Sequence, residues 1–174
     1  MRETSDMDVI EAIATRASAG RLRAPGPSDA HLALLLEAAN RAPDHGRLKP
    51  WRLLVLDPQS RERFVAAVVE ARRARPPAPT EEQLLREREK FERSPLLLVV
   101  ACVVQRDHPK VPEIEQILAA GAAVQNLFLA AHALGYGVMW KTGPAAYDPG
   151  VKAALGLRPE DHIVAIVHLG TREK

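Results

Sequence analysis

The 174-residue chain carries its apolar residues at two kinds of spacing. Repeats of three and four residues indicate amphipathic helices, and short apolar runs indicate strands. The helical spacing predicts helices at 6–19, between the N-cap Ser28 and Pro43, and at 59–75, 81–93, 113–134 and 149–155. The apolar runs predict strands at 51–56, 96–104, 138–142 and 162–170.

Two of these segments have unusual compositions. Residues 96–104 are continuously apolar, which is typical of a strand buried on both faces, so we expect it in the middle of the sheet. Residues 81–93 are so highly charged that we expect a helix with a solvated face. The Pro-rich stretch 76–80 before it cannot continue a helix and is interpreted as a linker.

The predicted helix at 113–134 contains the longest segment without charge. No Asp, Glu, Lys or Arg occurs between Glu115 and Lys141, a length that could cross a bilayer. Ala and Gly dominate the segment, however, and it includes two glutamines, an asparagine and a histidine, so a buried core helix is the better interpretation. Its Ala-rich stretch 119–123 permits close approach of another helix.

Composition narrows the class of protein further. With 47% hydrophobic and 26% charged residues, the chain is predicted to form one globular domain spanning 1–174. A net charge of +2 lacks the basic excess of a nucleic-acid binder. The first residues show no signal-peptide pattern, and the single cysteine, Cys102, lies in an apolar run. We therefore expect a cytoplasmic protein with neither nucleic-acid nor membrane partners.

Several catalytic motifs are absent from the sequence. There is no Walker loop, HExxH, CxxC or GxSxG, and Gly135-Tyr136-Gly137 lies between a helix and a strand, the reverse of a dinucleotide-binding turn. Three Asp-His pairs, at 44–45, 107–108 and 161–162, could suggest a metal site, but scattered surface histidines explain them better. No metal is predicted.

Two segments look suited to an anionic ligand. In the first, Arg16 and Ser18 lie near the end of a predicted helix and could grip a phosphate, although an arginine there also compensates a helix dipole. The second is the loop at 41–51, which gathers cationic side chains between two prolines. Such a loop would suit a flat, electron-rich ligand that carries negative charge.

The order of these segments resembles the FMN-dependent nitroreductase family, and specifically its short branch of NAD(P)H nitroreductases. The resemblance rests on IATRASAGRL, RAPDHGRLKPWRLLVL, AAHALGYGVMWKTG and HLGT, which follow one another over nearly the whole chain. It implies an α+β nitroreductase-like fold with a mostly antiparallel central sheet flanked by helices. It also implies an intertwined homodimer with two FMN sites at the interface, and we expect the helix containing Ala119–Val124 to form that interface.

The resemblance also assigns residues to the cofactors. For FMN, the matching positions are Arg16, Ala17 and Ser18 at the phosphate, Arg41 and His45 in the cationic loop, and Trp140, Lys141 and Thr142 after the long helix. For the nicotinamide nucleotide, they are Ala130, Ala131, His132, Ala133, Leu134 and Gly135. No catalytic side chain is implied, because FMN itself carries the chemistry.

The sequence departs from the family pattern at three places. Ala17 stands where many members have Arg or His, and Lys49 stands where Gln usually precedes Pro-Trp. The chain lacks a long C-terminal arm, so only Arg172 and Lys174 could supply basic phosphate contacts there. Strand alternation further predicts that neighbouring residues Trp140 and Lys141 face opposite sides.

The resemblance implies a function as well. NAD(P)H would reduce FMN and leave, and a nitroaromatic, quinone or enone would then be reduced at the same face in a ping-pong reaction. The alternatives are a flavin-binding module for storage or regulation, and an FMN enzyme with a different reaction, such as dehydrogenation or flavin fragmentation.

Overall fold

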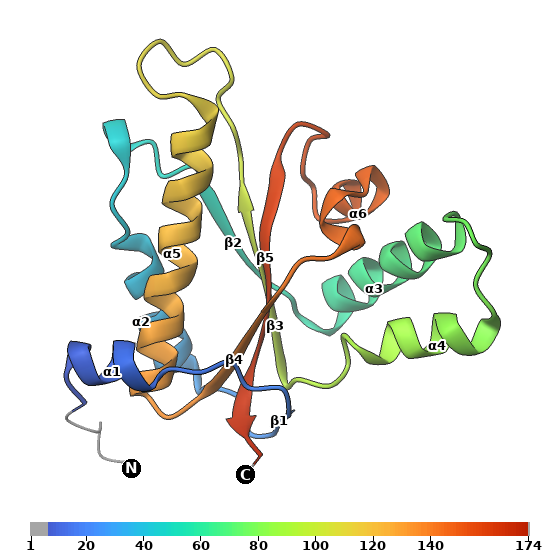
Figure 1. Ribbon diagram of the computed structural model, residues 1–174, viewed down its shortest axis with the longest axis horizontal. Coiled ribbons are helices and arrows are strands. Elements are labelled where there is room, and N and C mark those ends of the chain that lie inside the picture. Colours follow the sequence, from blue (N-terminus) through green and yellow to red (C-terminus); the bar gives the residue numbers. More distant parts are fainter. Residues whose placement is uncertain (1–6, 174) are drawn as a thin grey trace.

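The computed structural model describes residues 7–173 (Figure 1). Its helices are α1 Val9–Thr15, α2 Asp29–Asn40, α3 Pro58–Arg73, α4 Glu81–Glu89, α5 Glu113–Ala133 and α6 Pro149–Ala154, with short 3₁₀ turns η1 His45–Arg47 and η2 Pro144–Tyr147. Its strands are β1 Leu22–Arg23, β2 Trp51–Val55, β3 Leu96–Cys102, β4 Gly137–Lys141 and β5 His162–Arg172. All the predicted helices and strands are present, and β1 was not predicted.

All the described strand pairs are antiparallel, which confirms the predicted α+β class. The eleven-residue strand β5 pairs with β1, β3 and β4, and β3 also pairs with β2. Strand β3 therefore has a neighbour on each side, and its residues from Leu97 to Cys102 are buried. The prediction of a central, doubly covered strand is confirmed.

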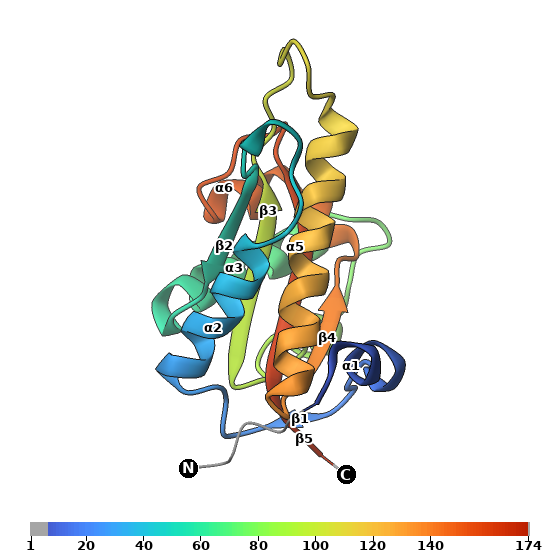
Figure 2. The same cartoon turned by 90° about the vertical axis from the view of Figure 1, so that its left-hand side faces the viewer.

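Helices cover both faces of this sheet. Helices α2 and α5 lie side by side on one face, as Figures 1 and 2 show, and α3 and α6 pack on the other. Each layer encloses its own apolar cluster: Leu35, Val100 and Leu127 belong to the first, and Phe64 and Ile166 to the second. The sheet therefore separates two cores.

Helix α5 buries its alanines inside the chain. Ala119, Ala120, Ala123 and Val124 are all buried in the cluster that includes residues of α2, and the Asn126 amide donates to the Ala38 carbonyl at 3.2 Å. These side chains are therefore covered within the same chain, whereas Ile114 and Leu118 of α5 stay exposed, so the expectation that α5 contributes to a dimer interface stays a prediction. By length and composition alone α5 could cross a membrane, but its packing is that of a core helix.

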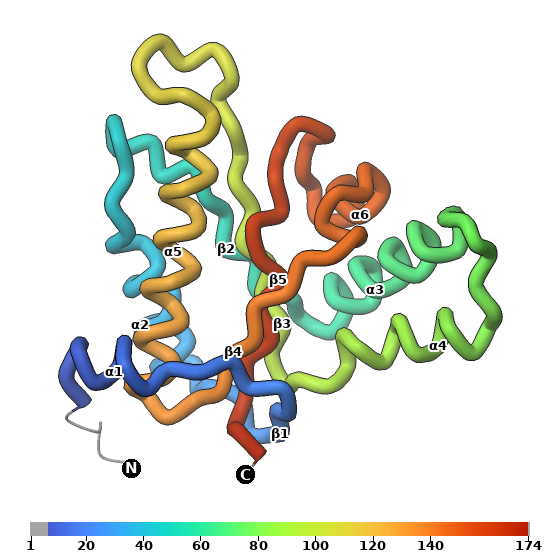
Figure 3. The backbone as a smooth tube through the Cα atoms, viewed as in Figure 1, coloured from blue at the N-terminus to red at the C-terminus, as the bar shows by residue number. Residues whose placement is uncertain are grey.

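The first helix is shorter than predicted. It ends at Thr15, and Arg16 adopts an extended conformation with φ −60° and ψ 124°. Beyond it, the Ala19 N–H donates to the Val138 carbonyl at 2.9 Å, so attachment to β4 replaces further helix. Figure 3 shows the chain crossing β4 on its way to β1. The start of the predicted helix at residue 6 lies outside the described residues.

Candidate functional site

The segment at 16–18 is held between three elements. The Arg172 guanidinium at the end of β5 donates to the Ala17 carbonyl, and Thr15 Oγ1 lies 2.8 Å from Nε2 of His132 on α5. The Arg16 guanidinium makes no ion pair within residues 7–173. Arg16, Ser18 and Arg172 thus gather around one end of α5, and the unpaired Arg16 is available for an anion. Lys174 lies outside the described residues.

A glycine makes this assembly possible. A Cβ at Gly137, the first residue of β4, would lie 2.6 Å from both Arg172 Cγ and Leu22 Cδ2 and 2.9 Å from Ala19 Cβ. Real side chains do not approach so closely, so only glycine lets the 16–22 segment lie across β4. The Gly-Tyr-Gly sequence therefore serves packing, which agrees with its exclusion as a dinucleotide loop.

Trp140 and Lys141 face opposite sides of β4, as strand alternation predicts. The Trp140 ring lies 6.0 Å from that of Phe128 on α5, and its Nε1–H donates to the Val164 carbonyl at 2.9 Å. The Lys141 side chain instead lines a cavity on the other side together with His168. Thr142 follows the strand and is exposed. The side chains of these three residues therefore do not converge on one point.

The cavity beside Lys141 has a volume of about 50 Å³. Three cationic side chains line it, and they come from two parts of the chain: Lys90 and Arg93 follow α4, and Lys141 ends β4. Lys90 and Arg93 have nearby glutamates on α4, at 2.6 and 3.9 Å, whereas Lys141 has no acidic partner among the described residues. Gly20, just beyond the 16–18 segment, lines the same cavity and joins the two features.

Apart from Lys141, sequence reasoning missed the side chains with polar atoms that line this cavity, namely Lys90, Arg93, Ser94 and His168. The two cations belong to a segment interpreted as a solvated helix, and nothing in its charge pattern distinguishes them. His168 did carry a signal, because a single histidine interrupts the apolar run of β5. Burial lowers its pKa to about 4, and the charges of Lys141 and Arg61 contribute to that shift.

The cationic loop lies elsewhere on the chain. Arg41, at the end of α2, is exposed and pairs with Glu37 at 3.2 Å, and His45 Nδ1 lies 2.6 Å from Glu115 Oε2 on α5. The loop is held in uncommon backbone conformations, since Arg47 and Lys49 have φ angles of 56° and 45°. Both side chains are exposed, and neither forms an ion pair in the part of the chain that the structure describes.

Two of the three predicted FMN-binding groups, the 16–18 segment and the cationic loop, therefore do not meet within one chain. His45 is tied to Glu115 and Thr15 to His132, and these α5 residues are 17 positions apart. At ~1.5 Å per residue, that spacing corresponds to about 26 Å along the helix. Figure 1 shows α1 near one end of α5 and the 45–47 turn near the other.

The segment predicted for the nicotinamide nucleotide forms the last turn of α5 and the turn after it. The side chain of Ala131 is fully buried, and the assignment of this segment to the nicotinamide nucleotide stays a prediction. His132 faces the 16–18 segment, and its pKa is lowered by burial and by the charges of Arg172 and Arg16. Gly135 has a φ of 80°, which allows the turn into β4.

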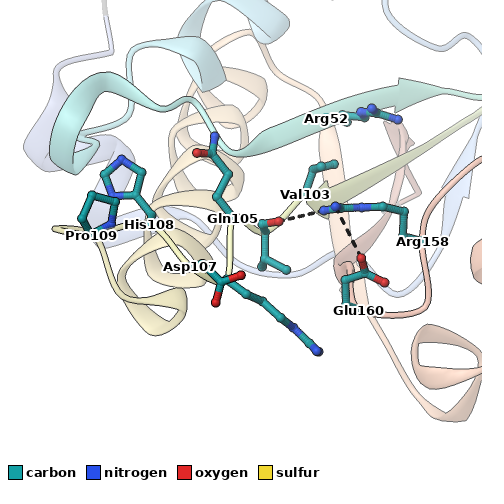
Figure 4. A pocket seen from close by; sticks show the side chains of 10 residues that line it. Arg52, Val103, Gln105, Asp107, His108, Pro109, Arg158 and Glu160 are labelled. Atoms are coloured by element: carbon teal, nitrogen blue, oxygen red, sulfur yellow. Dashed lines mark hydrogen bonds and ion pairs between the residues drawn. The ribbon is translucent and has the colours of Figure 1, made fainter.

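A larger hollow of about 790 Å³ lies beside the start of β2 and the end of β3 (Figure 4). None of the predicted site residues lines it. Its Arg158 is occupied by Glu160, by the Val104 carbonyl and by the buried carboxylate of Asp161. Although burial alone raises the pKa of Asp161, hydrogen bonds from Arg158 and Val104 outweigh it and hold that pKa below its ordinary value. This arrangement is structural.

The histidines of the Asp-His pairs do not gather either. His45 and His162 pair with separate glutamates on α5, and His108 Nδ1 accepts backbone N–H groups. Within residues 7–173, no three His, Cys, Asp or Glu side chains are placed to hold a metal ion.

Comparisons with known proteins agree with the fold and with the order of these segments. The model of the nitroreductase family matches residues 13–171. The Escherichia coli K12 protein named "Putative NAD(P)H nitroreductase YdjA" is 37% identical over 166 residues, which cover 95% of this chain and 88% of YdjA. A nitroreductase-like protein structure from Bacillus cereus has a TM-score of 0.80 at 27% identity, covering 96% of this chain and 87% of that chain. A Desulfovibrio desulfuricans structure in complex with FMN has a TM-score of 0.72 at 28% identity, covering 95% and 87%. The family that the sequence motifs indicated is confirmed, and the chain belongs to the nitroreductase family.

Proposed function

We propose that the protein is an FMN-dependent NAD(P)H oxidoreductase that reduces a nitroaromatic, quinone or enone acceptor. The observation that carries the proposal is the continuity between the unpaired Arg16 and the cation-lined cavity at Lys141, which Gly20 connects. The FMN in the related Desulfovibrio desulfuricans structure supports the choice of cofactor.

The residues present fit FMN in two respects. A flavin phosphate carries about −1.5 to −2 charges, by analogy with phosphoserine, and needs at least two strong donors. Arg16, Ser18 and Arg172 provide them around one end of α5. The cavity at Lys141 is too small for a whole flavin but can accept one polar edge of it, and the buried Nε2 of His168 has no hydrogen-bond partner among the described residues.

Some of these residues would bind FMN, and others would adjust its reduction potential. When bound, FMN would supply the redox chemistry by accepting a hydride from NAD(P)H and passing it to the acceptor. Arg16 and Ser18 would hold the phosphate. Lys141, which has no acidic partner within residues 7–173, would favour negative charge at the flavin edge. The last turn of α5 with His132 lies on the side proposed for the nicotinamide nucleotide.

We infer that a second copy of the chain completes the site as a homodimer. Arg41 and His45 lie about 26 Å along α5 from the Arg16 end, so they would reach a flavin only on a partner subunit. Apolar residues left exposed support this assembly. On α1 they are Val9, Ile10 and Ile13, and on α5 they are Ile114 and Leu118 at 59% and 64% exposure. The homodimer would bury these residues.

The proposal places the reaction in the cytoplasm, where NAD(P)H is available. Cys102 is a free, buried cysteine, which is compatible with a reducing compartment. Burial raises the pKa of its thiol to about 12, so the thiol is unreactive.

Steady-state kinetics of the purified, FMN-loaded chain test the function. We expect flavin absorbance, oxidation of NADH or NADPH with a quinone or nitroaromatic acceptor, and parallel double-reciprocal plots from the ping-pong mechanism. FMN binding without NAD(P)H oxidation would instead identify a storage or regulatory module. Formation of a dehydrogenated substrate or of flavin fragments, without reduction of the acceptor, would identify a different FMN reaction. Ultracentrifugation tests the assembly, since a stable FMN-loaded monomer would contradict the shared site.

A further inference from the structure

Ser94 and His168 form a buried polar pair between apolar side chains. Their exposures are 2% and 4%, and Ser94 Oγ lies 3.0 Å from His168 Nδ1. The imidazole also stacks on Phe91 with the ring centroids 5.9 Å apart. Nδ1 therefore has a partner, while Nε2 is buried and has none among residues 7–173. Buried polar atoms are nearly always hydrogen-bonded, so this nitrogen needs a partner that residues 7–173 do not supply.

The cavity that His168 lines selects for hydrogen-bond acceptors. Among the residues that the structure describes, its charged lining residues are the cations Lys90, Arg93 and Lys141, and no carboxylate lines it. Its volume of about 50 Å³ can hold a water or the carbonyl edge of a ring, but not the ring itself. A group that enters it must therefore be small at its leading edge and rich in acceptor oxygens.

Ser94 can determine which imidazole nitrogen carries the proton. Burial keeps His168 neutral, so the ring has one N–H and one lone pair. When the Ser94 hydroxyl donates to Nδ1, that nitrogen is the acceptor and the N–H is on Nε2. Nε2, which has no partner within residues 7–173, is then a hydrogen-bond donor, like the cationic groups that line the cavity.

We propose that His168 donates its Nε2–H to a carbonyl oxygen of the flavin ring, with Ser94 as the positioning residue that fixes the tautomer. This inference rests on the proposed flavin site. Lys141 would supply charge at that edge, whereas His168 would supply a neutral donor of fixed direction, packed on Phe91. The ring edge, rather than the phosphate, is the expected partner because Arg16, Ser18 and Arg172 gather separately at the end of α5.

Flavin-binding titrations of full-length variants test the contact. His168→Phe keeps a ring against Phe91 but removes both nitrogens, and His168→Gln restores a donor. The control is His162→Phe on the same strand, since His162 pairs with Glu113 and does not line the cavity. Loss of one neutral hydrogen bond should weaken binding of both FMN and riboflavin by about three- to tenfold. His168→Gln should recover most of that loss, and His162→Phe should bind both flavins normally.

The outcomes separate the possible failures. A loss for FMN but not for riboflavin would place His168 at the phosphate and overturn the ring assignment. Normal affinity of His168→Phe for both flavins would overturn the contact while leaving the flavin site intact. Failure of the unaltered protein to bind either flavin would overturn the proposed function as well.

Nitrogen NMR of the unaltered chain gives a readout that does not depend on variant folding. We expect the Nε2–H tautomer of His168 both without flavin and with FMN, with its Nε2 resonance shifting when FMN binds. Ser94→Ala should increase the Nδ1–H tautomer, because the donor to Nδ1 is gone. An Nδ1–H tautomer in the FMN-loaded, unaltered protein would overturn the proposal.

Discussion

Replacing Arg16 with alanine tests the phosphate end of the proposed flavin site. The Arg16 guanidinium makes no ion pair within the described chain, so its charge is available to a ligand. A hydrogen bond to a charged partner contributes roughly 1.5–3 kcal/mol, so FMN binding should weaken about ten- to hundredfold. Arg172 stays in place, which favours the lower end of that range. The free energy of unfolding should change by less than about 0.5 kcal/mol, because Arg16→Ala breaks no contact in the fold.

Riboflavin separates a phosphate contact from a general effect of Arg16. It lacks the phosphate, so fluorescence titrations should show equal riboflavin affinity for Arg16→Ala and the unaltered protein. Arg63→Ala, an exposed position on α3, is the matched control and should bind both flavins normally. Raising the salt to about 1 M should narrow the difference in FMN affinity, because the screening length falls to about 3 Å. The reasoning is refuted if Arg16→Ala binds FMN normally or if it loses riboflavin to the same extent.

Three further predictions concern charge, packing and pH. Lys141→Met should lower the reduction potential of the bound flavin, which a redox titration measures. In the flavin-free protein it should raise the pKa of His168 above about 4, which histidine NMR measures. If neither quantity changes, Lys141 is remote from both groups. Gly137→Ala should lower the free energy of unfolding in urea by about 1–3 kcal/mol, because the new Cβ would clash with Arg172 and Leu22. Gly121→Ala on α5 is the control and should be tolerated, because a Cβ there has no neighbour within 4 Å. Equal stability of the two variants would contradict the packing at Gly137. Asp161→Asn should cost about 1–3 kcal/mol at neutral pH. The pKa of Asp161 is lower in the folded than in the unfolded protein, so the stability that its carboxylate contributes is fully present above the unfolded pKa and is lost as the pH falls through the folded pKa. A stability difference between Asp161→Asn and the unaltered protein that persists below the folded pKa would contradict this reasoning.

The sequence predicts elements well where local pattern and packing agree. Strand β3 is apolar because both of its faces are covered, and α5 carries no charge after Glu115 because it packs against both α2 and the sheet. Strand β1 could not be predicted, since two residues carry no period and pair with β5 only because the chain crosses β4. The end of α1 was also missed, because a tertiary hydrogen bond from Ala19 to β4 stops the helix.

The candidate site is harder to predict than the fold. Motif order predicted both Arg16 and His45 as FMN-binding residues, but no local rule states that their segments attach to opposite ends of α5. Lys90 is indistinguishable by pattern from the other charges of its segment, and reaches the cavity only because α4 ends at Glu89. Alternation along β4, by contrast, correctly separated Trp140 from Lys141, since it depends only on the strand itself.

The position of β5 in the sheet has a consequence for synthesis. This strand comes last among the described elements, yet it pairs with β1, β3 and β4 and carries both His168 and Arg172. The N-terminal end of a nascent chain leaves the ribosome first, so β1, β3 and β4 lack the strand with which they pair until residues 162–172 have emerged. Many sheet contacts then close across long sequence separations, which slows folding. A ribosome-bound fragment that stops before residue 162 should therefore be sensitive to protease and unable to take up flavin.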